Sequence, residues 1–357
     1  MTSFGYVPYQ DLDGQPSIIV DGSAADGTVL TLSHWPKSPC PPGLEANLSA
    51  QMAYLYLDHR DNPDRRDLHQ ALQHDAVAVS NNHFDQDGLV SMFALLHPAE
   101  ALDRRQMLIE VAQSGDFAVY TDRNAARVSM VLSAYSDPAR SPLNTSAGVA
   151  DDYSAWCSLL YAELLPRLTD ICDHPDNYAE LWADEDRSLS ESEEAIRSKA
   201  VTIEEDPALD VAIFHVPEDA PDKGGHLFAG NWRKGLHPMA MHNATKMFRV
   251  ILVRGSRYEL YYRYESWVQY RTSRPLPRVD LAPLADQLNA LEQSEESHWK
   301  AGKFSAIAPE LVLVRGGGGG KSPESTIGAE QFVETAKRHL AEAPPAWDPY
   351  AAATAET

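Results

Sequence analysis

The segment spanning residues 75–96 constrains the fold more than any other part of this 357-residue chain. An apolar run at residues 76–79 is followed by a polar stretch, and a second apolar run covers residues 89–96. An apolar strand that leads through a polar loop into an apolar helix is typical of α/β proteins, which bind ligands at the carboxyl ends of their strands. We therefore predict an α/β fold with a functional loop between these two apolar runs.

Three polar residues of this loop, His83, Asp85 and Asp87, stand at every second position, and Gly88 follows them. Hard divalent cations prefer oxygen ligands, and imidazole suits Mn, Fe or Zn. Because like charges repel, two carboxylates this close are costly without a cation. We predict that all three residues bind metal and that Asp85 and Asp87 are catalytic. The alternative is that the aspartates cap the following helix and that the histidine is held by hydrogen bonds.

The string from His83 through Asp85, Asp87 and Gly88 to Ser91 resembles the first signature of the DHH phosphoesterase superfamily. In that family the histidine and the first aspartate bind one Mn ion, and the second aspartate binds its neighbour. The resemblance implies a metal-dependent phosphoesterase-like hydrolase that uses Mn or Mg on a small phosphorylated or nucleotide substrate. The Asp-His-His triplet that names the family is absent. The alternative is therefore a catalytically incomplete DHH-like binding or regulatory protein.

A two-metal site also needs a carboxylate that bridges both ions. Asp116 and Asp122 flank residues 116–121, which we predict to be a strand, and Asp122 would lie at its carboxyl end. His34 follows another predicted strand, at residues 28–32, and is a possible substitute for a missing histidine ligand. The alternatives are turn or helix-cap roles for the aspartates and a loop position for the histidine.

In DHH enzymes the second domain supplies arginine, histidine and glycine-rich contacts to the substrate phosphate. Arg271, Arg274 and Arg278 cluster in a proline-containing segment of this chain, and guanidinium groups match phosphate geometry. His237 lies in a Gly-Leu-His-Pro string that partly matches the family's substrate loop. We predict that these four residues bind substrate; for the arginines the alternative is surface salt bridges to the excess acidic residues.

The chain is long enough for two domains. We predict a DHH-like, parallel-sheet α/β domain over residues 1–198, with helices on both faces and an acidic helical segment at 151–198. A smaller α+β substrate domain would follow at 199–342, and the Pro/Ala-rich tail at 343–357 would be disordered. Within these domains, apolar spacing predicts helices at 100–113 and 125–135, and alternating runs around Gly255 predict a hairpin.

Charge and composition limit the partners. The chain has 52 acidic and 30 basic residues, for a net charge of −22, and such a surface repels nucleic acid and anionic membranes. We therefore expect a small phosphate-bearing substrate, no duplex nucleic acid and no membrane partner. Three cysteines without paired spacing, and no signal-peptide pattern, favour a cytoplasmic protein. No pattern in the chain predicts its oligomeric state.

Overall fold

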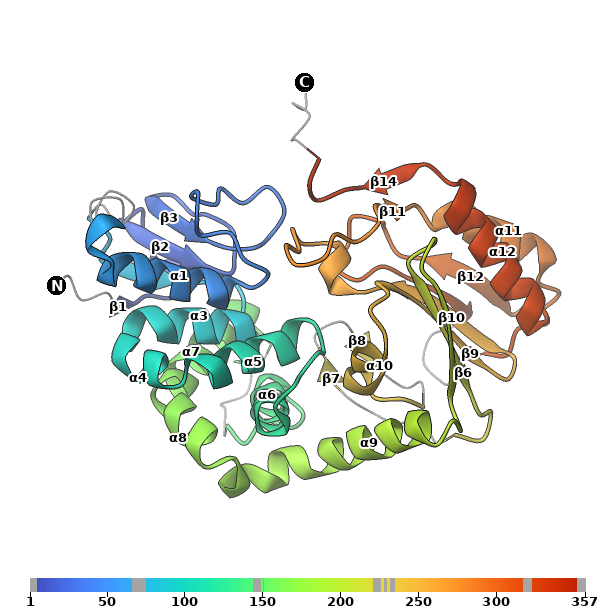
Figure 1. Cartoon of the computed structure of the whole chain (residues 1–357), viewed down its shortest axis with the longest axis horizontal. Coiled ribbons are helices and arrows are strands. Elements are labelled where there is room, and N and C mark those ends of the chain that lie inside the picture. The colour runs from blue at the N-terminus through green and yellow to red at the C-terminus, as the bar shows by residue number, and fades with distance from the viewer. Residues whose placement is uncertain are drawn as a thin grey trace. The chain divides into compact units, whose positions relative to one another are not determined.

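The chain forms two compact units. The computed structural model describes residues 5–65, 75–143, 149, 151–220, 226–227, 230–231, 235–316 and 323–351. The division falls between Arg187 and Ser188, and His226–Gly230 belongs to the first unit. Helix α9 (Ala179–Arg197) crosses this division, so the domain boundary that we predict at residue 198 coincides with the end of α9 instead (Figure 1).

A four-stranded parallel sheet is the centre of the first unit. Its strands lie in the order β1 (Gly5–Tyr6), β4 (Ala78–Ser80), β2 (Ser17–Val20) and β3 (Thr28–Leu32). Every residue of β2 and β4 is buried, as is usual for inner strands of a parallel sheet. The predicted α/β fold is confirmed. Since the strands are parallel, their carboxyl ends lie along one edge of the sheet.

Helices make up most of the rest of the first unit. They are α1 (Ser49–Asp61), α3 (Gln86–Leu96), α4 (Pro98–Asp103), α5 (Arg105–Asp116), α6 (Arg123–Ser136), α7 (Tyr153–Leu164) and α8 (Leu168–Asp173). Short 3₁₀ helices lie at Tyr9–Asp11, Pro63–Arg65, Leu165–Arg167 and Pro175–Tyr178. Residues 86–95 of α3 are all buried, because α3 packs against both α1 and α5.

Two local predictions in this unit change. The helix predicted at residues 100–113 is two helices, α4 and α5, which meet at Arg104. The strand predicted at residues 116–121 is wrong: Asp116 is the last residue of α5, and Ala118 has a φ of 52°, which an extended strand does not allow. The helix predicted at residues 125–135 is confirmed as part of α6.

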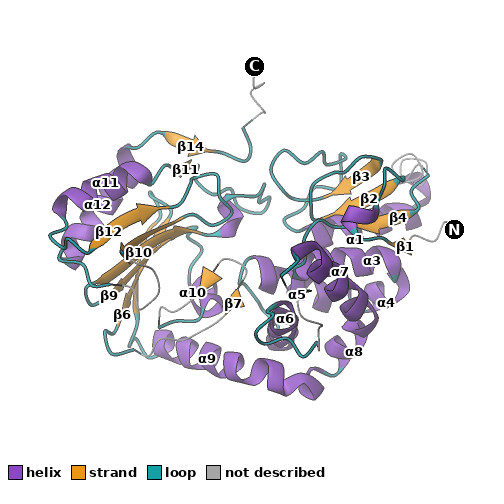
Figure 2. Ribbon diagram, turned by 180° about the vertical axis from the view of Figure 1, so that it is seen from behind, coloured by secondary structure: helices purple, strands orange, loops and turns teal. Residues whose placement is uncertain are grey.

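The second unit contains a six-stranded mixed sheet (Figure 2). Its order is β12 (Ser297–Ala301), β13 (Glu310–Arg315), β10 (Arg257–Tyr262), β9 (Arg249–Arg254), β6 (Val211–Val216) and β5 (Thr202–Asp206). Only β6 and β9 pair in parallel. The predicted hairpin is confirmed as β9 and β10, which turn at Gly255 with a φ of 57°.

Three further helices belong to this unit: α10 (Pro238–Ala244), α11 (Ala282–Leu291) and α12 (Ala329–Glu342). Leu284 and Leu288 of α11 and Phe332 of α12 join Ile251 and Leu260 of the sheet in one apolar core. A 3₁₀ helix of this unit lies at Tyr264–Ser266. In the first unit, β7 (His226–Leu227) pairs with β8 (Gly230–Asn231), whose last residue is assigned to the second unit.

The chain's last described segment is ordered in part. Residues Pro345–Trp347 form β14, which pairs antiparallel with β11 (Arg278–Val279). The disorder predicted for residues 343–357 is therefore wrong for this stretch, and residues 352–357 lie outside the described part of the chain. Across the described residues, no helix is both long and apolar enough to cross a membrane.

Candidate metal centre

Polar side chains follow three neighbouring strands at the point where each strand ends. Asp21 follows β2, His34 comes shortly after β3, and the loop that carries His83 follows β4. Because β4, β2 and β3 are adjacent and parallel, these side chains meet at the carboxyl edge of the sheet. The strand order thus brings together residues that are far apart in the sequence.

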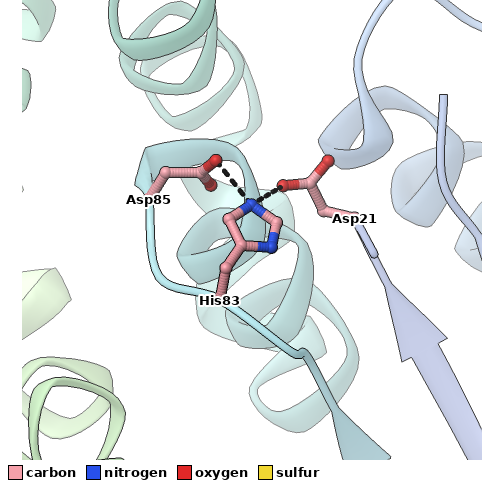
Figure 3. A group of neighbouring side chains, drawn as sticks. All are labelled: Asp21, His83 and Asp85. Atoms are coloured by element: carbon pink, nitrogen blue, oxygen red, sulfur yellow. Dashed lines mark hydrogen bonds and ion pairs between the residues drawn. The ribbon is translucent and has the colours of Figure 1, made fainter. Parts of the chain in front are cut away.

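The first group of possible metal ligands is Asp21, His83 and Asp85 (Figure 3). Nε2 of His83 lies 2.8 Å from Oδ2 of Asp85 and 3.3 Å from Oδ2 of Asp21. One ligand atom from each residue falls within 4.8 Å of the other two, and all three residues are buried. The group therefore offers one nitrogen and two oxygens to a cation.

The second group is Asp21, His34 and Asp87. Nε2 of His34 lies 3.5 Å from Oδ1 of Asp21, 3.8 Å from Oδ2 of Asp87 and 3.4 Å from Oδ2 of Asp116. Asp21 belongs to both groups, with one oxygen facing each histidine. It holds the shared place that we predict for Asp122 or Asp116.

We call the five residues of these two groups, together with Asp116, the ligand cluster. Its members are Asp21, His34, His83, Asp85, Asp87 and Asp116. Among the described residues, the ion-pair partners of Asp21, Asp85 and Asp87 are the two histidines, with no lysine or arginine. The cluster thus gathers four buried carboxyl groups around two imidazoles.

The surroundings of His34 determine its protonation state. Its Nδ1 lies 2.5 Å from the carbonyl oxygen of Asn47, which can only accept, so Nδ1 carries the proton. Burial lowers the pKa of His34 to about 4, which leaves the ring neutral with a lone pair on Nε2. That lone pair faces the oxygens of Asp21, Asp87 and Asp116. A carbonyl behind the far nitrogen is typical of metal-ligating histidines, so His34 could offer this lone pair to a cation.

The carboxylates of the cluster have shifted pKa values. Burial raises the pKa of Asp21 to about 7, and the charge of Asp85 adds to the shift. Burial also raises the pKa of Asp87 well above its usual value, helped by Asp21 and Asp85. Burial opposes the charge of Asp85 too, but His83 outweighs it and lowers the Asp85 pKa, while the pKa of His83 rises well above 6.5. The cluster therefore retains protons where a cation could replace them.

Backbone groups hold two of the carboxylates in place. Oδ1 of Asp85 accepts from the N–H of Gly88 at 2.8 Å, while its Oδ2 faces His83. Asp87 accepts from the N–H groups of Ser49 and Ala50, each at 2.7 Å, at the start of α1. The predicted alternative of helix capping is thus correct for Asp85, but it leaves one oxygen available. Each oxygen of Asp87 keeps a second lone pair.

Two neutral side chains support the same loops. Oγ of Ser49 donates to Oδ1 of Asp21 at 2.7 Å, and the hydroxyl of Tyr161 in α7 donates to the carbonyl of His83 at 2.9 Å. A side chain on Gly88 would have its Cβ 2.3 Å from Nδ2 of Asn81 and 2.7 Å from the Tyr161 hydroxyl. Glycine at this position therefore permits the close approach that shapes the loop.

The structure places Asp122 away from the cluster. It is exposed, and its side chain caps α6 by accepting from the N–H of Asn124 at 2.8 Å. Neither group of ligands includes it. The prediction of Asp122 as a bridging ligand depended on a strand at residues 116–121, and that strand does not form. Asp116 reaches His34 from the end of α5 instead.

Arg278 is a core residue of the second unit, and its guanidinium is bonded to the protein. It is fully buried and donates to the carbonyls of Phe304, Ala306 and Ile307 and to Oγ of Ser266. Burial lowers its pKa to about 9. The prediction of a substrate contact is wrong for Arg278 because every face of its guanidinium is committed to the protein.

The other predicted substrate residues lie in the second unit as well. Arg274 pairs with Asp348 at 2.8 Å, and exposed Arg271 donates to Gln269 at 2.7 Å. The salt-bridge alternative is thus correct for Arg274. His237 is buried at the start of α10, where its Nδ1 accepts from the N–H of Met239 at 3.2 Å. This is a capping role.

Two residues at the ligand cluster, Asp21 and Ser49, were not predicted as site residues from the sequence. Asp21 carries the same signal that drew attention to His34, since it directly follows an apolar strand, residues 17–20. Ser49 begins α1 and has no distinguishing pattern. Its role depends on where α1 starts relative to β2, which only the folded chain determines.

Comparison with known proteins assigns the chain to a family. Residues 2–351 match the family of unknown function DUF6687. The chain belongs to this family. Searches of curated proteins and of solved structures found no match. The ligand cluster is therefore the basis for inferring the function of this chain.

Proposed function

We propose that this DUF6687 protein is a metal-dependent hydrolase of small phosphate esters or nucleotides that uses two divalent cations in the ligand cluster. The observation that carries the proposal is that Asp21 is shared between two groups, each completed by one histidine and one more aspartate. A shared carboxylate between two sets of ligands is the arrangement of two-metal hydrolytic sites. The likeness of residues 83–91 to the DHH signature supports the same conclusion.

The ligand types favour manganese over magnesium. Each group contributes one imidazole nitrogen, and Mg²⁺ prefers oxygen ligands and water, whereas Mn, Fe and Zn accept imidazole. Bound cations would lower the pKa of a water molecule and offset the charge of a phosphate. The chain's own residues would orient them: Asn47 fixes the ring of His34, and Gly88 and Ser49 fix Asp85 and Asp87.

Charge and cysteine chemistry support the rest of the proposal. A net charge of −22 favours a small substrate over duplex nucleic acid. None of the three cysteines forms a disulfide, which fits a reducing, cytoplasmic setting.

Metal content tests the proposal directly. We expect purified protein, titrated with Mn²⁺, to bind two ions per chain. Asp21→Asn should abolish binding at both positions, because Asp21 belongs to both groups, whereas Asp85→Asn should abolish one. Asp122→Asn is the matched control, since asparagine caps a helix as well as aspartate does and Asp122 lies outside the cluster. Calorimetric titration and metal analysis give the stoichiometries.

Hydrolysis is the second measurement. Nitrophenyl phosphate mono- and diesters, followed by a panel of nucleotides, should be hydrolysed with Mn²⁺ and not with a chelator. Protein that binds no Mn²⁺ would contradict the whole proposal. Protein that binds two ions but hydrolyses none of these compounds would favour the alternative, a non-catalytic binding protein.

A further inference from the structure

Gln86 lies between two members of the ligand cluster, Asp85 and Asp87, but its side chain is bonded elsewhere. The residue is buried, and its Nε2 donates to the carbonyl of Ser129 at 3.0 Å and to Oγ of Ser133 at 2.8 Å. Both partners belong to α6. Because a buried amide without partners is costly, these bonds favour one placement of the first turn of α3 against α6.

Gly115 in α5 provides the space that Gln86 fills. A Cβ on Gly115 would lie 2.7 Å from Cβ, Cδ and Oε1 of Gln86, which is closer than real Cβ contacts come. A glycine inside a helix costs about 1 kcal/mol relative to alanine. The close packing of Gln86 explains why glycine stands at position 115 despite this cost.

This contact joins two parts of the ligand cluster. Asp85 and Asp87 flank Gln86 at the start of α3, and Asp116 directly follows Gly115 at the end of α5. Three carboxylates of the cluster therefore lie on the two backbone segments, the start of α3 and the end of α5, that meet at the Gln86–Gly115 contact. Oδ2 of Asp116 lies 3.4 Å from Nε2 of His34 in this arrangement.

Asp116 is the last residue of α5, at the negative end of the helix dipole, and it is buried. The dipole disfavours a carboxylate at this end of a helix, so the packing of α5 against α3 contributes to holding Asp116 in position.

We propose that Gln86 is a positioning residue of the ligand cluster, which holds Asp85, Asp87 and Asp116 at the spacing that bound cations require. The proposal rests on the proposed function, in that it assumes that the cluster holds two cations. It adds that Gln86, which lies outside the cluster, and Gly115, which has no side chain, together determine the affinity for the cations.

Two substitutions test this inference, and Mn²⁺ alone is the probe. Gln86→Met keeps the volume of the side chain and removes its hydrogen bonds, whereas Gly115→Ala keeps every polar group and pushes Gln86 away. Both should weaken Mn²⁺ binding by about 10–100-fold, as loss of outer-shell partners does elsewhere. The electron paramagnetic resonance signal of the magnetically coupled Mn pair should weaken in both variants.

Leu95→Ala is the control for a general loss of stability. Leu95 is buried in the last turn of the same helix α3, so the variant should unfold at lower temperature and still bind two Mn²⁺ ions with wild-type affinity. If Gln86→Met fails to fold, Ser133→Ala removes one acceptor of Gln86 and should give a smaller loss of affinity. In that case, unchanged affinity in Ser133→Ala would overturn the inference.

Two other results would also overturn the inference. One is wild-type Mn²⁺ affinity and coupling in both Gln86→Met and Gly115→Ala. The other is a loss of Mn²⁺ affinity in Leu95→Ala that equals the loss in Gln86→Met and Gly115→Ala when the loss of thermal stability is also the same. Wild-type protein that binds no Mn²⁺ would instead contradict the proposed function, so the two failures are distinguishable.

Discussion

At the scale of single residues, the ligand cluster contains buried groups whose surroundings shift their pKa values. His83 is charged beside Asp85, Asp21 has a pKa of about 7, and the pKa of Asp87 is raised further by its acidic neighbours. Asp85 is instead ionised beside His83, and burial keeps His34 neutral. Stability without metal must therefore depend on pH.

We expect metal-free protein to lose stability as the pH rises from about 6.5 to 8. Above its unfolded pKa of about 6.5, His83 binds a proton in the folded state that the unfolded chain has released, so its contribution is lost as the pH rises through the folded pKa. Asp21 adds to the loss up to about pH 7, because its folded pKa is also raised. The free energy of unfolding should fall by about 1 kcal/mol or more.

Urea unfolding at pH 6.5 and pH 8, with chelator and with Mn²⁺, measures this effect. Mn²⁺ should remove most of the pH dependence, because the cation replaces the protons. Metal-free stability that rises between these two pH values would contradict the assignment of raised pKa values to His83 and Asp21.

At the scale of elements, the turn from β4 into α3 is shaped by side chains that pack closely against its backbone. Asn81 and Tyr161 both lie against Gly88. The N–H of Gly88 donates to the side chain of Asp85, which caps the start of α3. The tyrosine comes from α7, a later part of the chain. Close contact therefore shapes this turn more than intrinsic helix propensity does.

Gly88→Ala should destabilise the protein by about 1–3 kcal/mol, although alanine favours a helix by about 1 kcal/mol. The added methyl group would lie 2.3 Å from Nδ2 of Asn81, and that atom is buried with little room to move. Gly5→Ala is the control, since nothing lies within 4 Å of a Cβ there. Thermal unfolding of both variants gives the comparison, and equal stability would show that the turn tolerates a side chain.

At the scale of the whole molecule, the two units contain different kinds of buried charge. The first unit holds the ligand cluster, in which carboxylates outnumber their histidine partners. The second holds Arg278, whose guanidinium binds three backbone carbonyls and a serine hydroxyl. The first arrangement suits a bound cation, and the second stabilises the fold.

Arg278→Met should lower the free energy of unfolding by about 3 kcal/mol or more, because it leaves buried carbonyls without donors. Folded Arg278→Met protein should still bind two Mn²⁺ ions, since the cluster belongs to the other unit. Arg271→Met, at an exposed position, should change stability by less than about 0.5 kcal/mol. Unchanged stability in Arg278→Met, with a raised KM for a phosphate ester, would restore the predicted substrate role.

Local sequence patterns predict many of the helices and strands, but only one loop of the candidate site. The apolar run, the alternating polar residues and the glycine predict β4, the loop and α3 from neighbouring residues alone, because periodicity reports which faces are buried. The same reasoning predicts the β9–β10 hairpin. It is wrong at residues 116–121, where Phe117 and Ala118 are buried but belong to none of the described sheets.

The sequence by itself determined that this is an α/β protein with His83, Asp85 and Asp87 between a buried strand and the helix that follows it. Only the tertiary structure decided which residues complete the cluster. Asp21 and His34 join it because β2 and β3 lie beside β4, and Asp116 joins it because α5 ends there. Strand order and helix packing depend on contacts between distant segments, which no local pattern records.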